Sequence, residues 1–507
     1  MIKNFEKILT LGELKKSGYK SRSIKEEMRE NLIDSFKNNK NIFEGIIGYD
    51  ETVIPDIQSS ILSRHNLILL GLRGQAKTKI ARLMVNLLDD YMPIIKDSEL
   101  FDDPLKPISR FGLDAIKENG NDTQIEWIKK EDRYTEKLAT PDVTIADLIG
   151  DVDPIKAASL KLPYSDERVI HFGLIPRSHR GIFVINELPD LQARIQVALF
   201  NILQEKDIQI RGFKIRLNLD VQFVFTANPE DYTNRGSIVT PLKDRIDSQI
   251  LTHYPKSLKL SKDITQREAK LTHDQKSNII PSELVKDLIE QISFEARESE
   301  YVDPKSGVSA RLTISAYENL ISTAERRMLI NKEKNSFVRI SDFIGVIPAI
   351  TGKIELVYEG EQEGPFKVAN ILISKSIRKQ FEHYFPSPDL IKKKKLENPY
   401  LEIIAWFNKG NSVDVLTTHS DKIYRNTLDS IPGLKKVVDK YVPDLDTAEY
   451  YLFMEFLLHG LAEYSLLSKH HIEFGMQFKD MLSSMFSKED DDSTDDSDFY
   501  SEDDFKF

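Results

Sequence analysis

Length, composition and charge set the first limits on this sequence of 507 residues. The length allows two to four domains that each bury a core. The shares of hydrophobic (40%) and charged (30%) residues are ordinary for globular proteins. Cysteine is absent, which excludes disulfides, thiolate catalysis and cysteine-based metal sites. No apolar run approaches the roughly 20 residues that cross a bilayer, and the first residues lack the apolar core of a signal peptide. We therefore expect a cytoplasmic protein without membrane insertion.

The net charge of −11 is concentrated at one end of the chain. Residues 488–507 contain ten acidic and two basic side chains and so carry −8 of it. Such a segment buries too little apolar surface to fold, and we expect residues 487–507 to be a disordered acidic tail. The tail is either a solubilising end or a docking segment, whose aromatic anchors would be Phe499, Tyr500, Phe505 and Phe507. The nearly neutral body and the acidic tail make nucleic acid an unexpected partner.

The rest of the chain divides by its hydrophobic pattern. Residues 1–40 alternate apolar and charged positions at helical spacing and predict an N-terminal helical segment. In residues 41–257, strand-like runs alternate with helical stretches, which predicts an α/β core with a parallel sheet. Residues 258–358 and 366–486 read as two helical blocks, joined by a linker at Glu359 to Pro365. The clearest predicted strands are Leu67–Leu70, Ile182–Ile185 and Val221–Thr226.

The first of these strands runs into a glycine-containing loop that ends in Lys-Thr. A phosphate loop requires Gly, four free positions and then Gly-Lys-Ser/Thr. Gly71, Lys77 and Thr78 fit this pattern, and Ala76 replaces the second glycine. In such loops backbone N–H groups wrap the phosphates, the lysine reaches the terminal phosphates and the hydroxyl ligates Mg²⁺. A helix expected from Lys79 to Leu88 adds its positive end. The predicted nucleotide-contacting residues are Gly71, Arg73, Gly74, Gln75, Ala76, Lys77, Thr78 and Lys79.

Two later strands end in polar side chains. Nucleotide hydrolases place Asp-Glu after a buried strand, where the Asp arranges the Mg²⁺ shell and the Glu polarises the attacking water. Here Glu187 keeps the second role, whereas Asn186 lacks the charge, which should weaken Mg²⁺ retention. Its amide oxygen can still accept a hydrogen bond from metal-bound water or from Thr78. Asn228 ends the third strand, where open sheets bind their ligands, and either positions the hydrolytic water or forms a plain Asn-Pro turn.

Together these motifs resemble those of ring-forming AAA+ ATPases of the MoxR and magnesium-chelatase branch. The closest resemblance is to long bacterial members labelled magnesium chelatase-like. Their phosphate loop reads Gly-Gln-Ala-Lys-Thr and their second motif reads Asn-Glu, so Ala76 and Asn186 are typical of that subfamily. The likeness extends from about Ile46 to Leu356 and includes the segments Gly48-Tyr49, Asp147–Pro154, His171–Gly181 and Thr226–Tyr232.

The resemblance implies an AAA+ phosphate-loop core with ATP and Mg²⁺ as cofactors, a helical lid at 258–358 and an additional C-terminal helical domain. It implies that Asp147 to Ile175 is an insertion projecting into a ring pore. Residues 208–217, which also read as a hairpin by their alternating pattern, match a second hairpin of this branch. The implied catalytic residues are Glu187, the first sensor Asn228, the arginine finger Arg245, with Arg235 as second candidate, and the second sensor Arg311.

The function that the resemblance implies is ATP-driven remodelling of a client protein by a hexameric ring. MoxR-like ATPases commonly work with a partner that carries a von Willebrand factor A domain. This chain has no Asp-x-Ser-x-Ser motif, so that partner would be a separate protein, docking on residues 366–485 or on the tail. The alternatives are a magnesium chelatase subunit, a DNA motor, and a non-hydrolysing switch or scaffold prompted by Ala76 and Asn186. Sigma-factor activation would require a Gly-Ala-Phe-Thr-Gly-Ala loop, which the sequence lacks.

Overall fold

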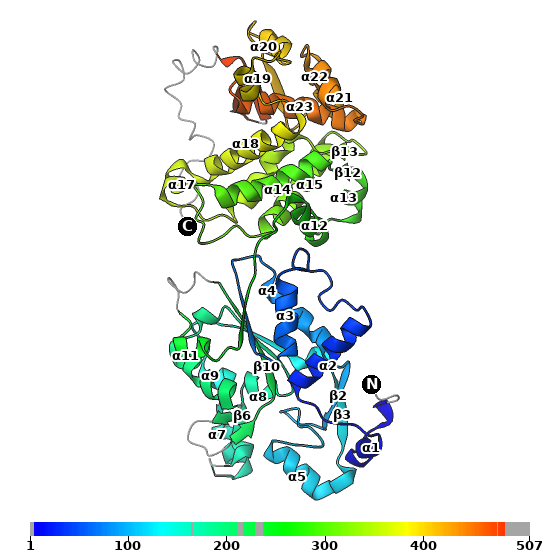
Figure 1. Ribbon diagram of the computed structural model, residues 1–507, viewed down its shortest axis with the longest axis vertical. Helices are drawn as coiled ribbons and strands as arrows, with labels where there is room; N and C mark the ends of the chain where they lie inside the picture. Colours follow the sequence, from blue (N-terminus) through cyan, green and yellow to red (C-terminus); the bar gives the residue numbers. More distant parts are fainter. Residues whose placement is uncertain are drawn as a thin grey trace. The chain divides into compact units, whose positions relative to one another are not determined.

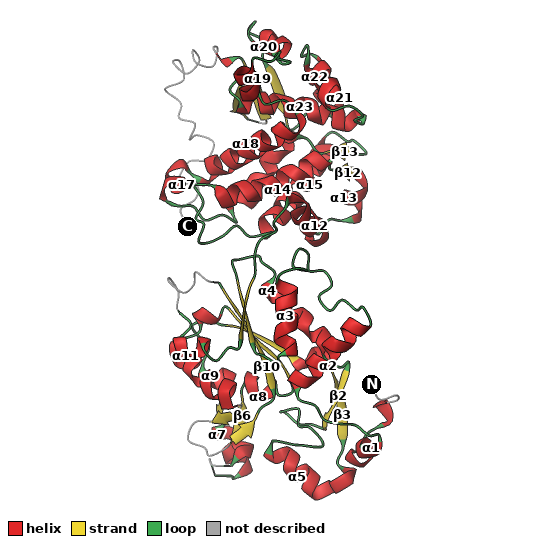
Figure 2. Cartoon of the chain, viewed as in Figure 1, coloured by secondary structure: helices red, strands yellow, loops and turns green. Residues whose placement is uncertain are grey.

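The computed structural model describes residues 5–163, 166–205, 207–209, 216–228, 237–473 and 475–481. The chain forms two compact units, Met1–Tyr254 and Pro255–Phe507 (Figure 1). The first is an α/β unit and the second is largely helical (Figure 2). Within the described ranges, no helix combines the length and the apolar content that crossing a bilayer requires. The predicted acidic tail, residues 487–507, lies outside the described residues.

A five-stranded parallel sheet is the centre of the first unit. Its strand order is β11-β1-β10-β7-β4, with every neighbouring pair parallel. The three central strands are buried along their whole length, as continuous apolar runs in a sheet covered on both faces should be. The three predicted strands are thereby confirmed. The strands are β1 (Leu67–Leu70), β4 (Tyr134–Leu138), β7 (Gly181–Asn186), β10 (Val221–Ala227) and β11 (Ser248–Leu251).

Helices cover both faces of this sheet. Because side chains alternate along a strand, Leu67 and Leu69 join one hydrophobic cluster, and Ile68 and Leu70 join the other. The first cluster contains α2 (Ile24–Lys37), α3 (Val53–Leu62) and α4 (Lys77–Leu83), and the second contains α8 (Leu174–Arg177), α9 (Ala193–Glu205) and α11 (Thr240–Lys243). The helix expected at Lys79 to Leu88 is α4, which begins two residues earlier, at Lys77, and ends earlier, at Leu83. A 3-10 helix, Met84–Leu87, continues it where Val85 and Asn86 favour the α-helix less.

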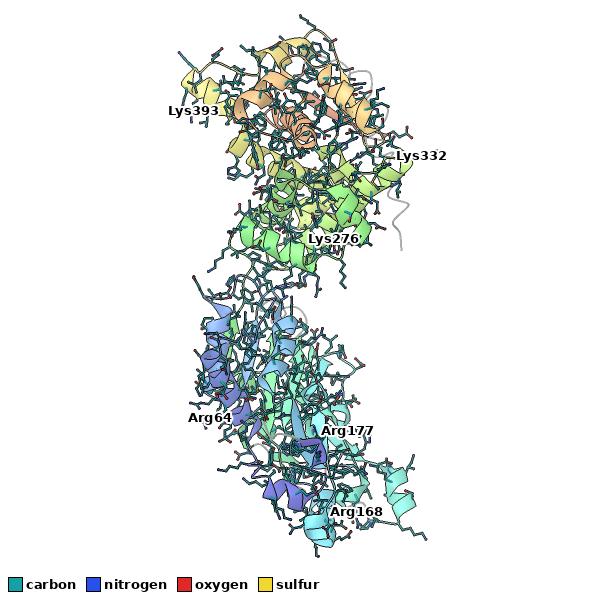
Figure 3. All side chains as sticks on the ribbon, turned by 90° about the vertical axis from the view of Figure 1, so that its right-hand side faces the viewer. Arg64, Arg168, Arg177, Lys276, Lys332 and Lys393 are labelled. Carbon is teal, nitrogen blue, oxygen red and sulfur yellow. The ribbon has the colours of Figure 1, made fainter. Side chains whose placement is uncertain are left out.

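Smaller strand pairs extend from the core of the first unit. The segment expected as a pore insertion contains the antiparallel pair β5 (Gly150–Val152) and β6 (Ile170–Phe172). Arg168, labelled in Figure 3, lies just before β6 and forms an ion pair with Asp166 (2.7 Å). The predicted second hairpin is confirmed as the antiparallel pair β8 (Asp207–Gln209) and β9 (Arg216–Asn218), and its turn lies outside the described residues. The remaining elements are α1 (Leu11–Lys16), β2 (Tyr91–Ile95), α5 (Arg110–Asn119), β3 (Ile125–Lys129), α6 (Ile145–Leu148) and α7 (Pro154–Leu160).

The second unit is helical, as expected, but also contains strands. A three-stranded antiparallel sheet has the order β14-β16-β15, and a short parallel pair joins β12 and β13. This sheet was not predicted, because only Val413 and Val415 of β14 show the buried alternation of a strand. The strands are β12 (Ile279–Ile280), β13 (Ser336–Phe337), β14 (Val413–Leu416), β15 (Ser468–Ile472) and β16 (Gly475–Lys479). The helices up to residue 351 are α12 (Leu258–Glu268), α13 (His273–Asn278), α14 (Glu283–Glu298), α15 (Arg311–Ile330), the 3-10 helix η7 (Ile340–Val346) and α16 (Ile347–Thr351).

The expected linker at Glu359 to Pro365 is instead helical. Residues Tyr358–Glu363 form α17, and Pro365 begins α18. Gly360 serves close packing, because a Cβ there would overlap the carbonyl oxygen of Tyr301, and Gly364 takes a positive φ of 82° between the two helices. Buried residues on both sides of this segment belong to one hydrophobic cluster. The later helices are α18 (Pro365–Tyr384), α19 (Pro388–Lys394), α20 (Leu401–Phe407), α21 (Asp421–Asp429), α22 (Leu434–Tyr441) and α23 (Thr447–Glu463).

Candidate functional site

The carboxyl ends of β1, β10 and β7 bring the three sequence motifs together. Leu70 of β1 is in register with Ala227 of β10, and the Gly71 N–H donates to the Ala227 carbonyl (3.2 Å). The next link is between β10 and β7, where the Glu187 N–H donates to Thr226 Oγ1 (3.1 Å). The phosphate loop, the Asn186-Glu187 pair and Asn228 therefore share one edge of the sheet, where open α/β sheets bind ligands.

The phosphate loop is fixed from inside by Gln75 and Thr252. Gln75 is buried, and its Oε1 accepts a hydrogen bond from Thr252 Oγ1 (2.7 Å). A Cβ at Gly71 would overlap both side chains, so this position requires glycine. The side chain of Gln75 thus supports the loop, and its predicted contact with the nucleotide stays a prediction. Tyr49 Oη also lies 3.1 Å from the Gln75 carbonyl, and burial raises the pKa of Tyr49 to about 12, which keeps it protonated.

The loop backbone has the curvature of an anion cradle. Gly74 and Ala76 have positive φ angles of 75° and 58°. Successive turns of this kind direct N–H groups toward one side of a loop. Ala76 pays roughly 1 kcal/mol or more for a conformation that glycine adopts freely, and it lies directly before the first turn of α4. The loop therefore keeps the glycine conformation at the one position where the sequence departs from the pattern.

Lysine side chains close this loop. Lys77 is only 7% exposed, and its ammonium donates to the carbonyls of Gly71 and Leu72 (3.1 Å for Leu72). The lysine is thus held inside the loop that would surround a phosphate. Thr78 follows it in the first turn of α4, as the prediction requires of a metal-ligating hydroxyl. Lys79 donates to the Gly45 carbonyl (3.1 Å), and the exposed Arg73 has its carbonyl within 3.0 Å of Tyr254 Oη.

Asn186 is held by a carboxylate that the sequence analysis missed. Its Nδ2 donates to Glu136 Oε1 (2.6 Å), and its Oδ1 accepts from Thr226 Oγ1 (3.1 Å). Glu136 lies on β4 and also accepts hydrogen bonds from Arg82 (2.8 and 3.1 Å) and Tyr134 (3.0 Å). Burial opposes ionisation of Glu136, but the bonds from Arg82, Tyr134 and Asn186 outweigh it and lower the pKa of Glu136. A charged carboxylate therefore lies directly beside the asparagine.

Glu187 and Asn228 show the features of poised polar groups. Glu187 has φ 54° and ψ 53°, a left-handed conformation that non-glycine residues adopt mainly where function or surrounding structure enforces it. Asn228 is only 7% exposed, and its Oδ1 has no hydrogen-bond partner within the described part of the chain. Leaving a buried acceptor unpaired costs about 1–3 kcal/mol, so this oxygen is suited to receive a hydrogen bond from a ligand or water.

Two of the predicted arginines, Arg245 and Arg311, are described by the structure. Arg245 follows α11 and is held against α9: it donates to Gln204 Oε1 (3.0 Å), and its guanidinium lies 4.9 Å from the Phe200 ring centroid. Arg311 is exposed and is the first residue of α15, in the second unit. Arg235 lies outside the described residues. Their roles as finger and sensor stay predictions.

A family model described as the Sigma-54 interaction domain matches residues 164–249, which include Glu187, Asn228 and Arg245. Solved structures are also similar. NtrX from Brucella abortus is 12% identical, with 57% of this chain and 55% of that chain covered and a TM-score of 0.32, so this chain spans about half of its length. A putative ATPase from Cytophaga hutchinsonii is 16% identical (69% and 95% covered, TM-score 0.28). A complex of the magnesium chelatase subunits BchI and BchD gives 17% identity (63% and 98% covered, TM-score 0.33).

The assignment of the fold rests on the molecule itself. Five parallel strands have the phosphate loop after β1, a polar pair after β7 and an asparagine after β10, the strand that separates them. The match to the Sigma-54 interaction domain covers the polar pair after β7 and the asparagine after β10, and the phosphate loop lies outside it. The predicted α/β class with a helical C-terminal region is confirmed, and the chain has the fold of an AAA+ ATPase.

Proposed function

We propose that this protein hydrolyses Mg-ATP and uses the energy, as a ring, to remodel or activate a client protein. The observation that carries the proposal is the meeting of the phosphate loop, Glu187 and Asn228 at adjoining strand ends. In this proposal the loop N–H groups and Lys77 hold the phosphates and Thr78 ligates Mg²⁺. Glu187 polarises the attacking water, and the unpaired oxygen of Asn228 holds that water in place.

The Glu136–Asn186 pair fits a Mg²⁺ site in an unusual way. The Asp expected at the strand end is replaced by two side chains: Asn186 supplies an oxygen and Glu136 supplies the negative charge. Because Glu136 holds the Asn186 NH₂ group, the amide oxygen faces Thr226 and keeps a lone pair for a metal-bound water. Bound Mg²⁺ would neutralise charge on the terminal phosphates. We propose that Thr78 and Asn186 serve it, with Glu136 behind them.

Steady-state ATP turnover of the full chain with Mg²⁺ tests the proposal. Replacing Glu187→Gln should lower turnover by at least about 100-fold, since the variant loses a general base, and should leave nucleotide binding intact. Glu131→Gln is the matched control, because Glu131 is an exposed carboxylate of the same unit. Equal turnover in the two variants would contradict the role of Glu187 as general base. Absence of turnover in the parent protein, while ATP still binds, would contradict hydrolysis and favour the switch or scaffold.

The ring, the client and the partner are the finer parts of the proposal. Arg245 would act on the nucleotide of a neighbouring subunit, and Arg311 would contact the terminal phosphate. Measurement of the molecular mass in the presence of ATP should give a hexamer. The Arg245→Ala variant should lose ATP turnover but still bind nucleotide. A separate protein with a von Willebrand factor A domain is the proposed partner. Salt-sensitive DNA binding would instead favour a motor, and dependence on a porphyrin-binding subunit would favour a chelatase.

A further inference from the structure

A cavity of about 420 Å³ is lined by residues of the second unit alone, and no residue of the candidate nucleotide site is among them. It is bordered by η7, α18, α23 and the β15–β16 hairpin. This volume is typical of small-molecule sites, which range from roughly 300 to 1,000 Å³. Most of the surface of its wall is apolar, and Phe343, Ile344, Ile371, Ile377 and Met476 contribute to it.

Two buried polar groups of the lining lack partners. His459 is 3% exposed, and within the described residues neither ring nitrogen has a hydrogen-bond partner. The nearest carboxylate oxygen, Glu455 Oε1, is 4.0 Å away, and the Glu455 carboxylate already accepts bonds from the Ile340 and Ser341 N–H groups and from Tyr424. Ser341 is 5% exposed, and its hydroxyl is also unpaired in this part of the chain. Each unpaired group costs about 1–3 kcal/mol.

The protonation state of His459 determines which hydrogen-bond partners its ring can take. Burial, followed by the charges of Lys469 and His471, lowers the pKa of His459 well below its ordinary value. The ring is therefore neutral, with one N–H donor and one acceptor nitrogen. Both His459 and Ser341 are among the residues that line the cavity.

Positive charge exceeds negative charge around this cavity. One face of α18 lines it, with cationic side chains at Lys367, Lys375 and Arg378 at helical spacing. Lys469 adds a fourth cation and is bound to Glu463 and to Ser374 (3.0 Å for Ser374). Glu463 is the one carboxylate among the described lining residues. Outside the lining, Glu363 forms an ion pair with Lys367 and Asp389 forms one with Arg378, so the excess positive charge is that of Lys375. This excess favours an anionic molecule over a cationic one.

We propose that this cavity is a binding site for a small organic anion with an apolar body. The apolar wall takes the body of the molecule. Its polar group pairs with His459 and Ser341, and Lys375 supplies complementary charge. The site is independent of the proposed ATPase reaction, since all of its residues belong to the second unit.

The test uses the aromatic sulfonate 8-anilinonaphthalene-1-sulfonate as the probe, titrated into the full-length protein by fluorescence. We expect saturable binding with one site per chain. Ile371→Trp, which fills a half-buried part of the wall, should abolish it. His459→Leu should weaken it about tenfold, the effect of losing one hydrogen bond to a charged ligand.

Thermal melting separates this role from a purely structural one. His459→Leu removes two unpaired nitrogens from a buried position and should keep or raise the melting temperature while it weakens the probe. His383→Leu is the matched control, because His383 is exposed on α18 and outside the lining, and it should leave probe affinity unchanged. Equal probe affinity in the parent protein, His459→Leu and Ile371→Trp would overturn the proposal. Binding that emerges only after residues 487–507 are removed would also overturn it, in favour of the tail as occupant.

Discussion

At the scale of single residues, the departures from the usual motifs are matched by their surroundings. Ala76 adopts the left-handed backbone that a glycine would adopt, and Asn186 has the Glu136 carboxylate beside it. The sequence identifies both departures but not the compensation. Glu136 stands in a strand without a motif of its own, and its proximity to Asn186 depends on which strand pairs with β7.

Exchanging the charge between these two positions tests whether Glu136 serves the metal. Glu136→Gln should raise the Mg²⁺ concentration needed for tight ATP binding by roughly 10–100-fold, the usual cost of losing a partner behind a metal ligand. Metal-free ATP binding should not change. The double variant Glu136→Gln/Asn186→Asp puts a carboxylate at the strand end and should recover most of the loss. Mg²⁺ titration of the binding of a fluorescent ATP analogue measures both effects.

Two results of that titration would be decisive against the role. If Glu136→Gln behaves like the exposed control Glu131→Gln, the Glu136 carboxylate only supports β4 and Arg82. If the double variant needs as much Mg²⁺ as Glu136→Gln alone, a carboxylate at the end of β7 does not stabilise the bound metal.

At the scale of elements, one buried ion pair ties the N-terminal helical segment to the sheet. Arg133, just before β4, donates to both carboxylate oxygens of Glu27 on α2 (2.7 and 2.6 Å), and its Nε donates to the Arg180 carbonyl (2.9 Å). Both side chains are almost fully buried. The amphipathic pattern of residues 1–40 predicts α2, but not that one of its glutamates is an internal anchor.

Breaking this pair should destabilise the first unit strongly. Arg133→Met leaves the Glu27 carboxylate buried without its cationic partner, which should cost about 3–5 kcal/mol and lower the melting temperature of the first unit. Removing both charges, with Glu27→Leu in the same chain, should restore much of the loss. Lys37→Met breaks a solvent-exposed pair with Asp34 on the same helix and should change stability by less than about 1 kcal/mol. Similar melting of Arg133→Met and Lys37→Met would contradict the anchor.

Helices and strands were predicted correctly where the hydrophobic pattern of the sequence is clear. Strands β1, β7 and β10 are short, mainly apolar runs, which are typical of a sheet covered on both faces, so the sequence was sufficient to find them. Strand β15 consists of partly exposed side chains and shows no such run. The glycines at 360 and 364 led to the prediction of a linker where the structure has helices. Gly360 allows a close approach to the Tyr301 carbonyl and does not provide flexibility.

At the scale of the whole molecule, the two predicted helical blocks are joined by buried links. Gln380 of α18 donates to Gln291 of α14 (3.0 Å), and Glu455 of α23 accepts from the backbone N–H groups at the start of η7. These links connect residues on either side of α17 and lie within one hydrophobic cluster that extends from Ile279 to Phe478. The clusters of the first unit extend from Ile24 to Ile250. Each unit therefore has a core of its own.

This arrangement predicts where the chain can be divided. A fragment of residues 255–507 retains a complete core and should unfold in one cooperative thermal transition, with affinity for the anionic probe within about twofold of the full chain. A fragment of residues 366–507 loses Gln291 and η7. Gln380 then has no buried partner and the Glu455 carboxylate keeps the bond from Tyr424 but loses those from η7, at roughly 1–3 kcal/mol for each group left unpaired. It should show no cooperative transition by circular dichroism. A cooperative 366–507 fragment would show instead that the two helical blocks are separate domains, as their sequence patterns alone suggest.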